Sequence, residues 1–527
     1  MGAAKKPVNI FKLNRGDDPK EVLNWRLWFA VFSFGIMGAA RGIDEGLISG
    51  TFNTKHFQSI LHLDELDDVT YANVKGNVSA MVQIGSVAGA LLAFLVADRI
   101  GRLWATRQLC IVWILGVIIF LTNNGRLGQV YAGRFIMGIG IGETTVIAPV
   151  YIAEVAPKAV RGLCTCVFAG AVYIGIMLAY FTTWGSSLHL DQYTANAWVI
   201  PTTLHIMFAG IILILSFFNF ESPRYLIKRG DIQHAITNLA RVRGLPEDHE
   251  VIVHEIYDIR HQLEEEQEAT MGQGVFGILR EMFCMPNNAY RLYLGLGVQL
   301  LSQWSGAGSI TIYAADFFAL LGTKGQNEKL FATAIFGVVK FVAAIMCALF
   351  LVDVIGRKRA LTIGISLQAL AMVYIASFLT AVPNLEEPDF VFTSAQKHAS
   401  IGAIVMIYVS GFGSLVMCFH FINQYGNSKA VPSMLLSTSH GGMTAKGTFW
   451  LFFAITAMGG VWVWFTIPET AGLSLEATDR LFSLPWYKIG TQGRKNADFE
   501  VQVERERQLA EKPGAAEVEV IESDRRV

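Results

Sequence analysis

Charged side chains are scarce in this sequence of 527 residues. Only 16% of the residues are Asp, Glu, Lys or Arg, whereas 53% are hydrophobic. A water-soluble surface needs far more charge, so a soluble protein of several domains is excluded. The net charge of −1 also lacks the basic excess that nucleic-acid binding requires, so we expect no nucleic-acid partner.

Cysteine is scarce as well, and the six cysteines are scattered through apolar segments. The one close pair, Cys164 and Cys166, lies two residues apart inside a hydrophobic run, where the two side chains point to different faces of a helix. This spacing favours core packing over a metal site or a disulfide. No catalytic constellation or cofactor motif is present either, so we expect no metal, no cofactor and no enzymatic activity.

Apolar runs long enough to cross a bilayer as helices dominate the chain. They lie near residues 25–50, 77–97, 103–122, 128–153, 163–185, 197–219, 290–320, 329–352, 359–382, 399–418 and 447–467. The sequence therefore predicts an all-α integral membrane protein. We expect an N-terminal segment (1–26), a first half (27–219), a charged helical loop (220–289), a second half (290–467) and a tail (468–527).

The orientation follows from the connecting loops, which are basic at alternate positions. Arg99 and Arg107 flank the connection after the second span, and Lys358 and Arg359 follow the eighth, whereas residues 186–196 hold no Lys or Arg. By the positive-inside rule, the N-terminus and the charged loop are cytoplasmic. The polar first 26 residues have no signal-peptide cleavage pattern, so we expect the first span to serve as its own anchor. We expect a multi-pass protein, in the plasma membrane.

A short motif relates the two halves. Residues 98–102 read DRIGR, and residues 353–357 read DVIGR at the matching place in the second set of spans. Two copies in corresponding loops indicate duplicated halves with a binding site between them near mid-membrane.

Together with other segments, these motifs resemble the sugar porter family of the major facilitator superfamily. The matching segments are residues 98–102, 133–142 (GRFIMGIGIG), 149–162 (PVYIAEVAPKAVRG), 221–226 (ESPRYL), 353–358 and 468–477 (PETAGLSLEA). The resemblance implies a major facilitator fold with two six-helix halves, a cytoplasmic helical loop and alternating access to a central site.

The resemblance also implies a cytoplasmic gate made of charged residues. Its candidates are Asp98, Arg102, Glu154, Arg161, Glu221, Arg224, Asp353, Arg357 and Glu469. Asp44 and Arg134 align with the pair that couples transport to protons. The physical case for this pair is independent, because a nearby cation controls the protonation of an acid in low dielectric.

Substrate ligands are expected from several spans. The candidates are Arg41, Gln299, Ser302, Gln303, Gly308, Tyr313, Lys340, Asn423 and Asn427. Sugar porters typically carry amides at the positions of Ala169, Ser302 and Gly308, so the usual glucose ligands are incomplete. Cations at Lys340 and Arg41 suit a carboxylate, which makes a uronate or a quinate-like acid an alternative to a neutral monosaccharide. Glu45 and Glu143 offer the cations structural partners, so this choice stays open.

The second half is shorter than the resemblance requires. After residues 411–413 (GFG) the chain runs almost directly into 417–420 (MCFH), where the family continues through the end of span 10 and a basic loop. We infer that roughly 25 to 30 residues are missing there, which truncates the region of spans 10 and 11.

The sequence thus predicts a secondary active transporter that takes up a monosaccharide or related polyhydroxy compound with protons. The expected partners are this small sugar-like substrate, the proton and the lipid bilayer, and the protein is expected to be a monomer. A non-transporting nutrient receptor on the same fold is the alternative from another class. Such a receptor is expected to carry a long signalling tail, whereas the tail here is short and without low-complexity repeats.

Overall fold

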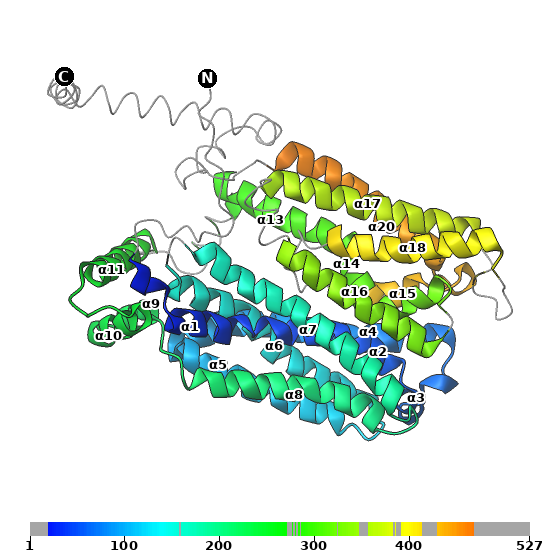
Figure 1. Ribbon diagram of the computed structural model, residues 1–527, viewed down its shortest axis with the longest axis horizontal. Helices are drawn as coiled ribbons and strands as arrows, with labels where there is room; N and C mark the ends of the chain where they lie inside the picture. Colours follow the sequence, from blue (N-terminus) through cyan, green and yellow to red (C-terminus); the bar gives the residue numbers. More distant parts are fainter. Residues whose placement is uncertain are drawn as a thin grey trace.

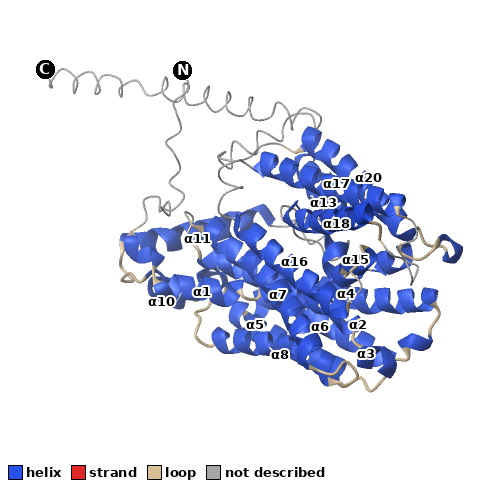
Figure 2. Cartoon of the chain, turned by 45° about the vertical axis from the view of Figure 1, so that its right-hand side comes forward, coloured by secondary structure: helices blue, strands red, loops and turns tan. Residues whose placement is uncertain are grey.

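The computed structural model describes residues 19–157, 160–270, 286–323, 325–346, 357–382, 392–413 and 429–467, with a few single positions between them. Within these ranges the chain forms helices and connecting loops without a strand, as expected. Figure 1 shows two bundles of roughly parallel helices, one from each half of the chain. In Figure 2 the same two bundles are again distinct and meet where α16, α7 and α15 are labelled.

The first half begins with a span in two pieces, α1 and α2, and continues with five long helices. The bounds are η1 (Lys20–Leu23), α1 (Trp25–Gly35), α2 (Gly38–Phe52), α3 (Lys55–Ile60), η2 (Leu63–Glu65), α4 (Asp68–Ile100), α5 (Arg102–Leu121), α6 (Leu127–Val155), α7 (Arg161–His189) and α8 (Asn196–Ser216). These helices correspond to the six apolar runs predicted for this half.

The second half contains a span in three pieces, α13 to α15, followed by longer helices. The bounds are α13 (Pro286–Trp304), α14 (Ala307–Ile312), α15 (Ala314–Leu320), α16 (Gln326–Met346), α17 (Arg357–Ala381), α18 (Ser394–Gly413), η5 (Thr438–His440) and α20 (Thr444–Thr466). Among the described residues of both halves, nine helical segments are long and apolar enough to cross a membrane.

The helical loop predicted between the halves is present as α9 (Pro223–Lys228), α10 (Ile232–Arg243) and α11 (Glu250–Thr270). Its apolar residues form a small core of their own around Ala235 and Leu263. We call the end of the bundles that carries these helices the loop face, and the opposite end, with α3 and α15, the far face (Figure 1).

Side-chain bonds fasten the helical loop to the first half. The buried guanidinium of Arg243 binds both carboxylate oxygens of Glu255 at 3.0 and 2.6 Å and donates to the Val155 carbonyl at the end of α6. Asn24 caps α1 and also donates to the Val242 carbonyl at 2.8 Å. The loop helices therefore hold the ends of α1 and α6 together.

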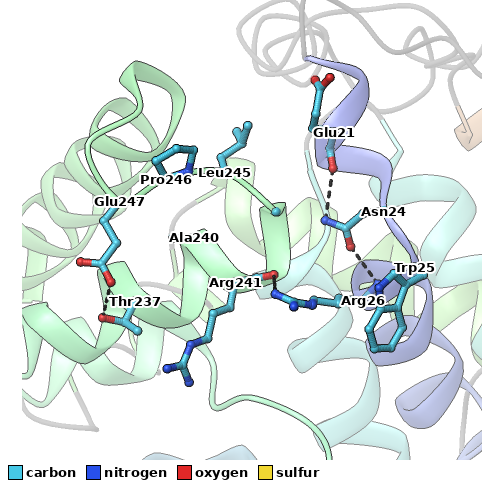
Figure 3. Close-up of a pocket in the computed structure, with 11 residues that line it drawn as sticks. Glu21, Asn24, Trp25, Arg26, Thr237, Ala240, Arg241, Leu245, Pro246 and Glu247 are labelled. Carbon is cyan, nitrogen blue, oxygen red and sulfur yellow. Dashed lines mark hydrogen bonds between the residues drawn. The ribbon is translucent and has the colours of Figure 1, made fainter.

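A pocket of about 630 Å³ lies where the start of α1 meets α10. Figure 3 shows Arg26 reaching the Arg241 carbonyl, with Glu247 bonded to Thr237 on the far wall. Acidic and basic groups are mixed here, and the pocket is built from the loop helices and the chain around the start of α1.

Close packing of α2 on α7 depends on glycine. A Cβ atom at Gly175 would lie 2.5 Å from the Ala39 carbonyl oxygen, whereas one at Gly170, on the same helix, meets open space. Backbone atoms cannot yield in the way that the end of a flexible side chain can, so only glycine fits at position 175.

We expect Gly175→Ala to lower the free energy of unfolding by about 1 to 3 kcal/mol, because the added methyl forces α2 and α7 apart. Gly170→Ala is the matched control and should be neutral or slightly stabilising, since alanine is the better helix former. Thermal unfolding of the purified variants in detergent measures both. Equal melting temperatures for the two variants would show that the close approach of α2 and α7 is wrong.

The region of spans 10 and 11 is short in the structure as well. Helix α18 ends at Gly413, residues 414–428 lie outside the described residues, and the chain is described again from Lys429. The Lys429 carbonyl lies beside Gly76 of α4, near the far face. Fifteen residues separate these points, fewer than the ~20 that one bilayer-crossing helix needs, so the missing stretch inferred from the sequence is consistent with this geometry.

Candidate transport site

An ion pair between Asp44 of α2 and Arg134 of α6 lies in the interior of the first half. Arg134 Nη1 lies 2.7 Å from Asp44 Oδ1, and both residues are 3% exposed. Arg134 Nε also donates to the Val78 carbonyl of α4 at 3.2 Å. The pair therefore joins three helices, and the two residues that the sequence singled out, 90 positions apart, are in direct contact.

Arg41 stands one helical turn before Asp44 and is itself paired. Its Nε lies 2.8 Å from Glu45 Oε1 on the same helix. Glu45 thus neutralises Arg41, as one of the readings of the sequence allowed. This pairing weakens the case for Arg41 as a free cation for the substrate.

The seventh span is broken where the sequence places most substrate ligands. Gly306, between α13 and α14, has a φ of +85°, which favours glycine because a side chain is strained there. Ser302 and Gln303 are buried before the break, and Gln299 is half-buried one turn earlier. Hydropathy alone predicted one continuous span here.

The Gln303 side chain lies beside Gly308. A Cβ atom on Gly308 would lie 2.8 Å from Gln303 Oε1, so the Gln303 amide fills the space that a side chain at position 308 would need. Tyr313, the last candidate of this span, is 2% exposed between α14 and α15.

Lys340 of α16 lies buried where the two halves meet. Its ammonium donates to the Thr311 hydroxyl of α14 and lies 5.2 Å from the centre of the Phe336 ring and 5.9 Å from that of Tyr173. Tyr180 of α7 donates to the Thr311 carbonyl at 2.6 Å. Lys340 therefore belongs to a cluster from α7, α14 and α16, as a substrate ligand between the halves would.

The sequence analysis missed the other members of this cluster. Tyr173, Tyr180 and Thr311 are polar or aromatic residues inside apolar runs, which is a common pattern for core packing as well. Their juxtaposition with a buried cation is visible only in three dimensions.

Four candidate gate residues of the first half, Asp98, Arg102, Glu154 and Glu221, form one network on the loop face. Arg102 binds both oxygens of Glu154 at 3.0 and 2.7 Å and lies 3.2 Å from Asp98. Glu221 accepts hydrogen bonds from the backbone N–H groups of Arg102 and Leu103 at 3.0 and 3.1 Å. The arrangement ties the starts of α5 and the helical loop to the end of α6.

Glu221 lies outside the membrane-spanning helices, between α8 and α9. Burial raises the pKa of its carboxyl above the ordinary value, although backbone N–H groups and Arg102 oppose the rise. Gly101, with a φ of +91°, lets the backbone pass close to this carboxylate.

The remaining candidates are less well placed or not described. Arg161 is exposed at the start of α7 and Arg224 is half-buried in α9. Asn423, Asn427, Asp353 and Glu469 lie outside the described residues, as does the side chain of Arg357. Their predicted roles in substrate binding and in the gate stay predictions.

Several bonds join the two halves at the far face. Lys329 of α16 donates to Asn53 Oδ1 at 2.8 Å, and Gln326 donates to the Asn53 carbonyl at 3.1 Å. Ser187 at the end of α7 donates to Asn327 at 3.2 Å. These bonds hold the far ends of α2, α7 and α16 together, so the far face is closed between these helices.

Comparison with known proteins identifies the family to which this chain belongs. Residues 30–482 match the model of the family described as "Sugar (and other) transporter". A probable quinate permease of Aspergillus niger is 29% identical over 493 residues, covering 88% of this chain and 89% of the relative. The quinate permease of Emericella nidulans is 28% identical over 489 residues, covering 88% and 90%.

Solved structures with the same fold include the major facilitator proton:xylose symporter XylE bound to 6-bromo-6-deoxy-D-glucose. It has a TM-score of 0.67 and 20% identity and covers 85% of this chain and 98% of that chain. The partially occluded inward-open form of XylE from E. coli has a TM-score of 0.66 and 19% identity, with coverages of 84% and 100%. The fold is thus a major facilitator fold, and the chain belongs to the sugar (and other) transporter family.

Proposed function

We propose that this chain is a proton-coupled secondary transporter of a small polyhydroxy compound, with the loop face in the cytoplasm. The observation that carries the proposal is the buried pair of Asp44 and Arg134, which joins three helices of the first half. A buried acid whose charge is matched by one cation is suited to couple proton binding to the arrangement of helices.

The coupling follows from the bonds of the pair. While Asp44 is ionised, it holds Arg134 and thereby α2 against α6. When Asp44 takes up a proton, the ion pair is lost, and Arg134 keeps its bond to the Val78 carbonyl of α4. The protonated state therefore frees α2 to move, and the two halves can exchange which face is open.

For the substrate we propose a cyclic hydroxy acid of the quinate type, with a neutral monosaccharide as the second candidate. Several curated relatives are named as quinate permeases, and the amides typical of sugar sites are replaced at Ser302 and Gly308. The buried ammonium of Lys340 supplies a cation for a carboxylate at the junction of the halves. The tyrosines of the same cluster offer hydroxyl groups and ring faces to a polyhydroxy ring.

Lys340→Asn tests this choice. We expect the variant to lose at least about tenfold in affinity for the anion, because a hydrogen bond to a charged group is worth that much or more. Competition of labelled uptake by matched pairs, quinate against its uncharged methyl ester and galacturonate against galactose, measures the preference. If neutral compounds compete better in the parent, and Lys340→Asn leaves the ranking unchanged, Lys340 is a structural ion.

We further propose that the protein acts as a monomer in the plasma membrane. Uptake into reconstituted vesicles against a concentration gradient separates a transporter from a receptor on the same fold. Because residues 414–428 are few for the span they must supply, the same assay should include a chain lengthened there with the matching segment of a quinate permease relative. Binding without accumulation by both chains would favour the receptor.

A further inference from the structure

A second cavity, of about 470 Å³, opens at the far face between the two halves. Tyr71 and Lys75 of α4 line it from the first half, and Tyr313 and Asp316 line it from the second. This size lies within the range of small-molecule sites. A cavity lined by both halves changes shape whenever the halves move.

Lys75 and Asp316 form an ion pair across this cavity. Lys75 Nζ lies 2.7 Å from Asp316 Oδ2, and the two side chains are 12% and 23% exposed. The ammonium also lies 6.0, 6.0 and 5.6 Å from the ring centres of Phe52, Tyr71 and Tyr313. Lys75 thus lies among three aromatic rings and is paired with Asp316 of the second half.

The pair cannot persist through a transport cycle. Lys75 belongs to the first half and Asp316 to the second, so opening of the far face draws the two charges apart. Once the far face is open, the Lys75 ammonium has lost the carboxylate of Asp316 and lies on the wall of an open cavity, where a ligand carboxylate can pair with it. The open state therefore favours any ligand that brings a carboxylate to Lys75.

We propose that Lys75 is an entry site for the carboxylate of an anionic polyhydroxy substrate, and that Asp316 occupies this site while the far face is closed. The substrate carboxylate replaces that of Asp316 when the halves part, and Asp316 displaces it again as they close. The hydroxyl groups and ring faces of Tyr71 and Tyr313 suit the hydroxylated ring that carries the acid. The substrate class rests on the proposed function.

This site is separate from the one at Lys340. Lys340 donates to Thr311 of α14 inside the junction of the halves, whereas Lys75 lines a cavity that opens at the far face. An incoming anion would thus meet two cations in succession. A neutral sugar can accept hydrogen bonds from either ammonium but forms no ion pair with it, so the two sites favour acids over neutral sugars.

Exchanging the charges of Lys75 and Asp316 distinguishes two roles for the pair. It is either a substrate entry site or a latch, meaning an ion pair that only holds the closed halves together. Lys75→Met removes the cation, and Asp316→Asn removes the competing carboxylate. The double variant Lys75→Asp with Asp316→Lys restores an ion pair between the halves but moves the cation to the other wall. Each variant is reconstituted as the full chain, and the KM of labelled quinate and of its uncharged methyl ester is measured.

We expect Lys75→Met to raise the KM of quinate at least about tenfold and to leave that of the methyl ester within about twofold. Asp316→Asn should not raise the KM of quinate, because the carboxylate that competes for Lys75 is gone. The double variant should keep the raised KM. A reporter cysteine, Ala72→Cys, is added to each chain, because Ala72 lines the cavity and its labelling by an impermeant maleimide reports opening of the far face. Both single variants should increase this labelling, and the restored pair of the double variant should return it to the parent level.

The outcomes distinguish this inference from the proposed function. Normal quinate accumulation by the parent, with an unchanged KM in Lys75→Met, overturns the entry site alone. Recovery of the parent KM by the double variant also overturns it, because the pair would then act only as a latch. No uptake or binding of quinate by the parent overturns both the proposed substrate and the entry site.

Discussion

Asp44→Asn is expected to abolish accumulation of substrate while leaving exchange of labelled for unlabelled substrate across the membrane. Asparagine cannot release or bind the proton, so the pairing of residue 44 with Arg134 no longer responds to the proton gradient. A carboxylate carried together with one proton moves no net charge, so the pH gradient drives its accumulation, and one pH unit supplies about 1.4 kcal/mol, which corresponds to about tenfold accumulation. The accumulation ratio of the variant should therefore fall to about one.

Two other substitutions of acidic residues serve as controls for Asp44→Asn. Asp44→Glu keeps a titratable group at the same place and should retain part of the accumulation. Asp191→Asn removes an exposed acid that bonds to the Tyr193 backbone in the loop after α7, and it should accumulate substrate like the parent. Undiminished, uncoupler-sensitive accumulation by Asp44→Asn would show that Asp44 is not the coupling acid.

Arg102→Ala is expected to cause the largest loss of stability among the gate residues. Arg102 is buried, binds both oxygens of Glu154 and also contacts Asp98, so its removal leaves the Glu154 carboxylate without its cation. Breaking a buried ion pair on one side costs about 3 to 5 kcal/mol. Unfolding of the purified variant in detergent measures the change in free energy.

Arg99→Ala is the matched control, since Arg99 lies three residues away and is exposed. We expect it to change stability by no more than about 0.5 kcal/mol. The pair Arg102→Met with Glu154→Leu should recover part of the loss, because replacing a buried ion pair by apolar groups is often neutral. Equal stability of Arg102→Ala and Arg99→Ala would mean that the network contributes little.

Much of this architecture could be predicted from the sequence because a bilayer imposes long apolar runs. The repeated motif at 98–102 and 353–357 indicated two halves, and the pairing of Asp44 with Arg134 followed from the resemblance and from charge balance. Their contact at 2.7 Å confirms the pairing, while its role in coupling stays a prediction. The resemblance implied the helical loop, whose apolar residues form a small core of their own.

Other features could not be predicted, because they depend on how the halves meet or on local backbone and side-chain geometry. Lys75 and Asp316 lie near the ends of apolar runs, where a charge normally faces water, and only the meeting of the two halves at the far-face cavity makes them partners. The break of the seventh span depends on one backbone angle at Gly306, which hydropathy does not report. The filling of the Gly308 space by Gln303 is likewise a matter of side-chain direction.

Proton movement driven by the substrate tests the central proposal most directly. Proteoliposomes carrying the full chain are held at zero potential with equal pH on both sides, and quinate is added outside, with protein-free liposomes as the control. We predict that the medium becomes more alkaline as quinate enters, and that Asp44→Asn abolishes this change. Entry of quinate at the parent rate without any change of external pH would contradict proton coupling.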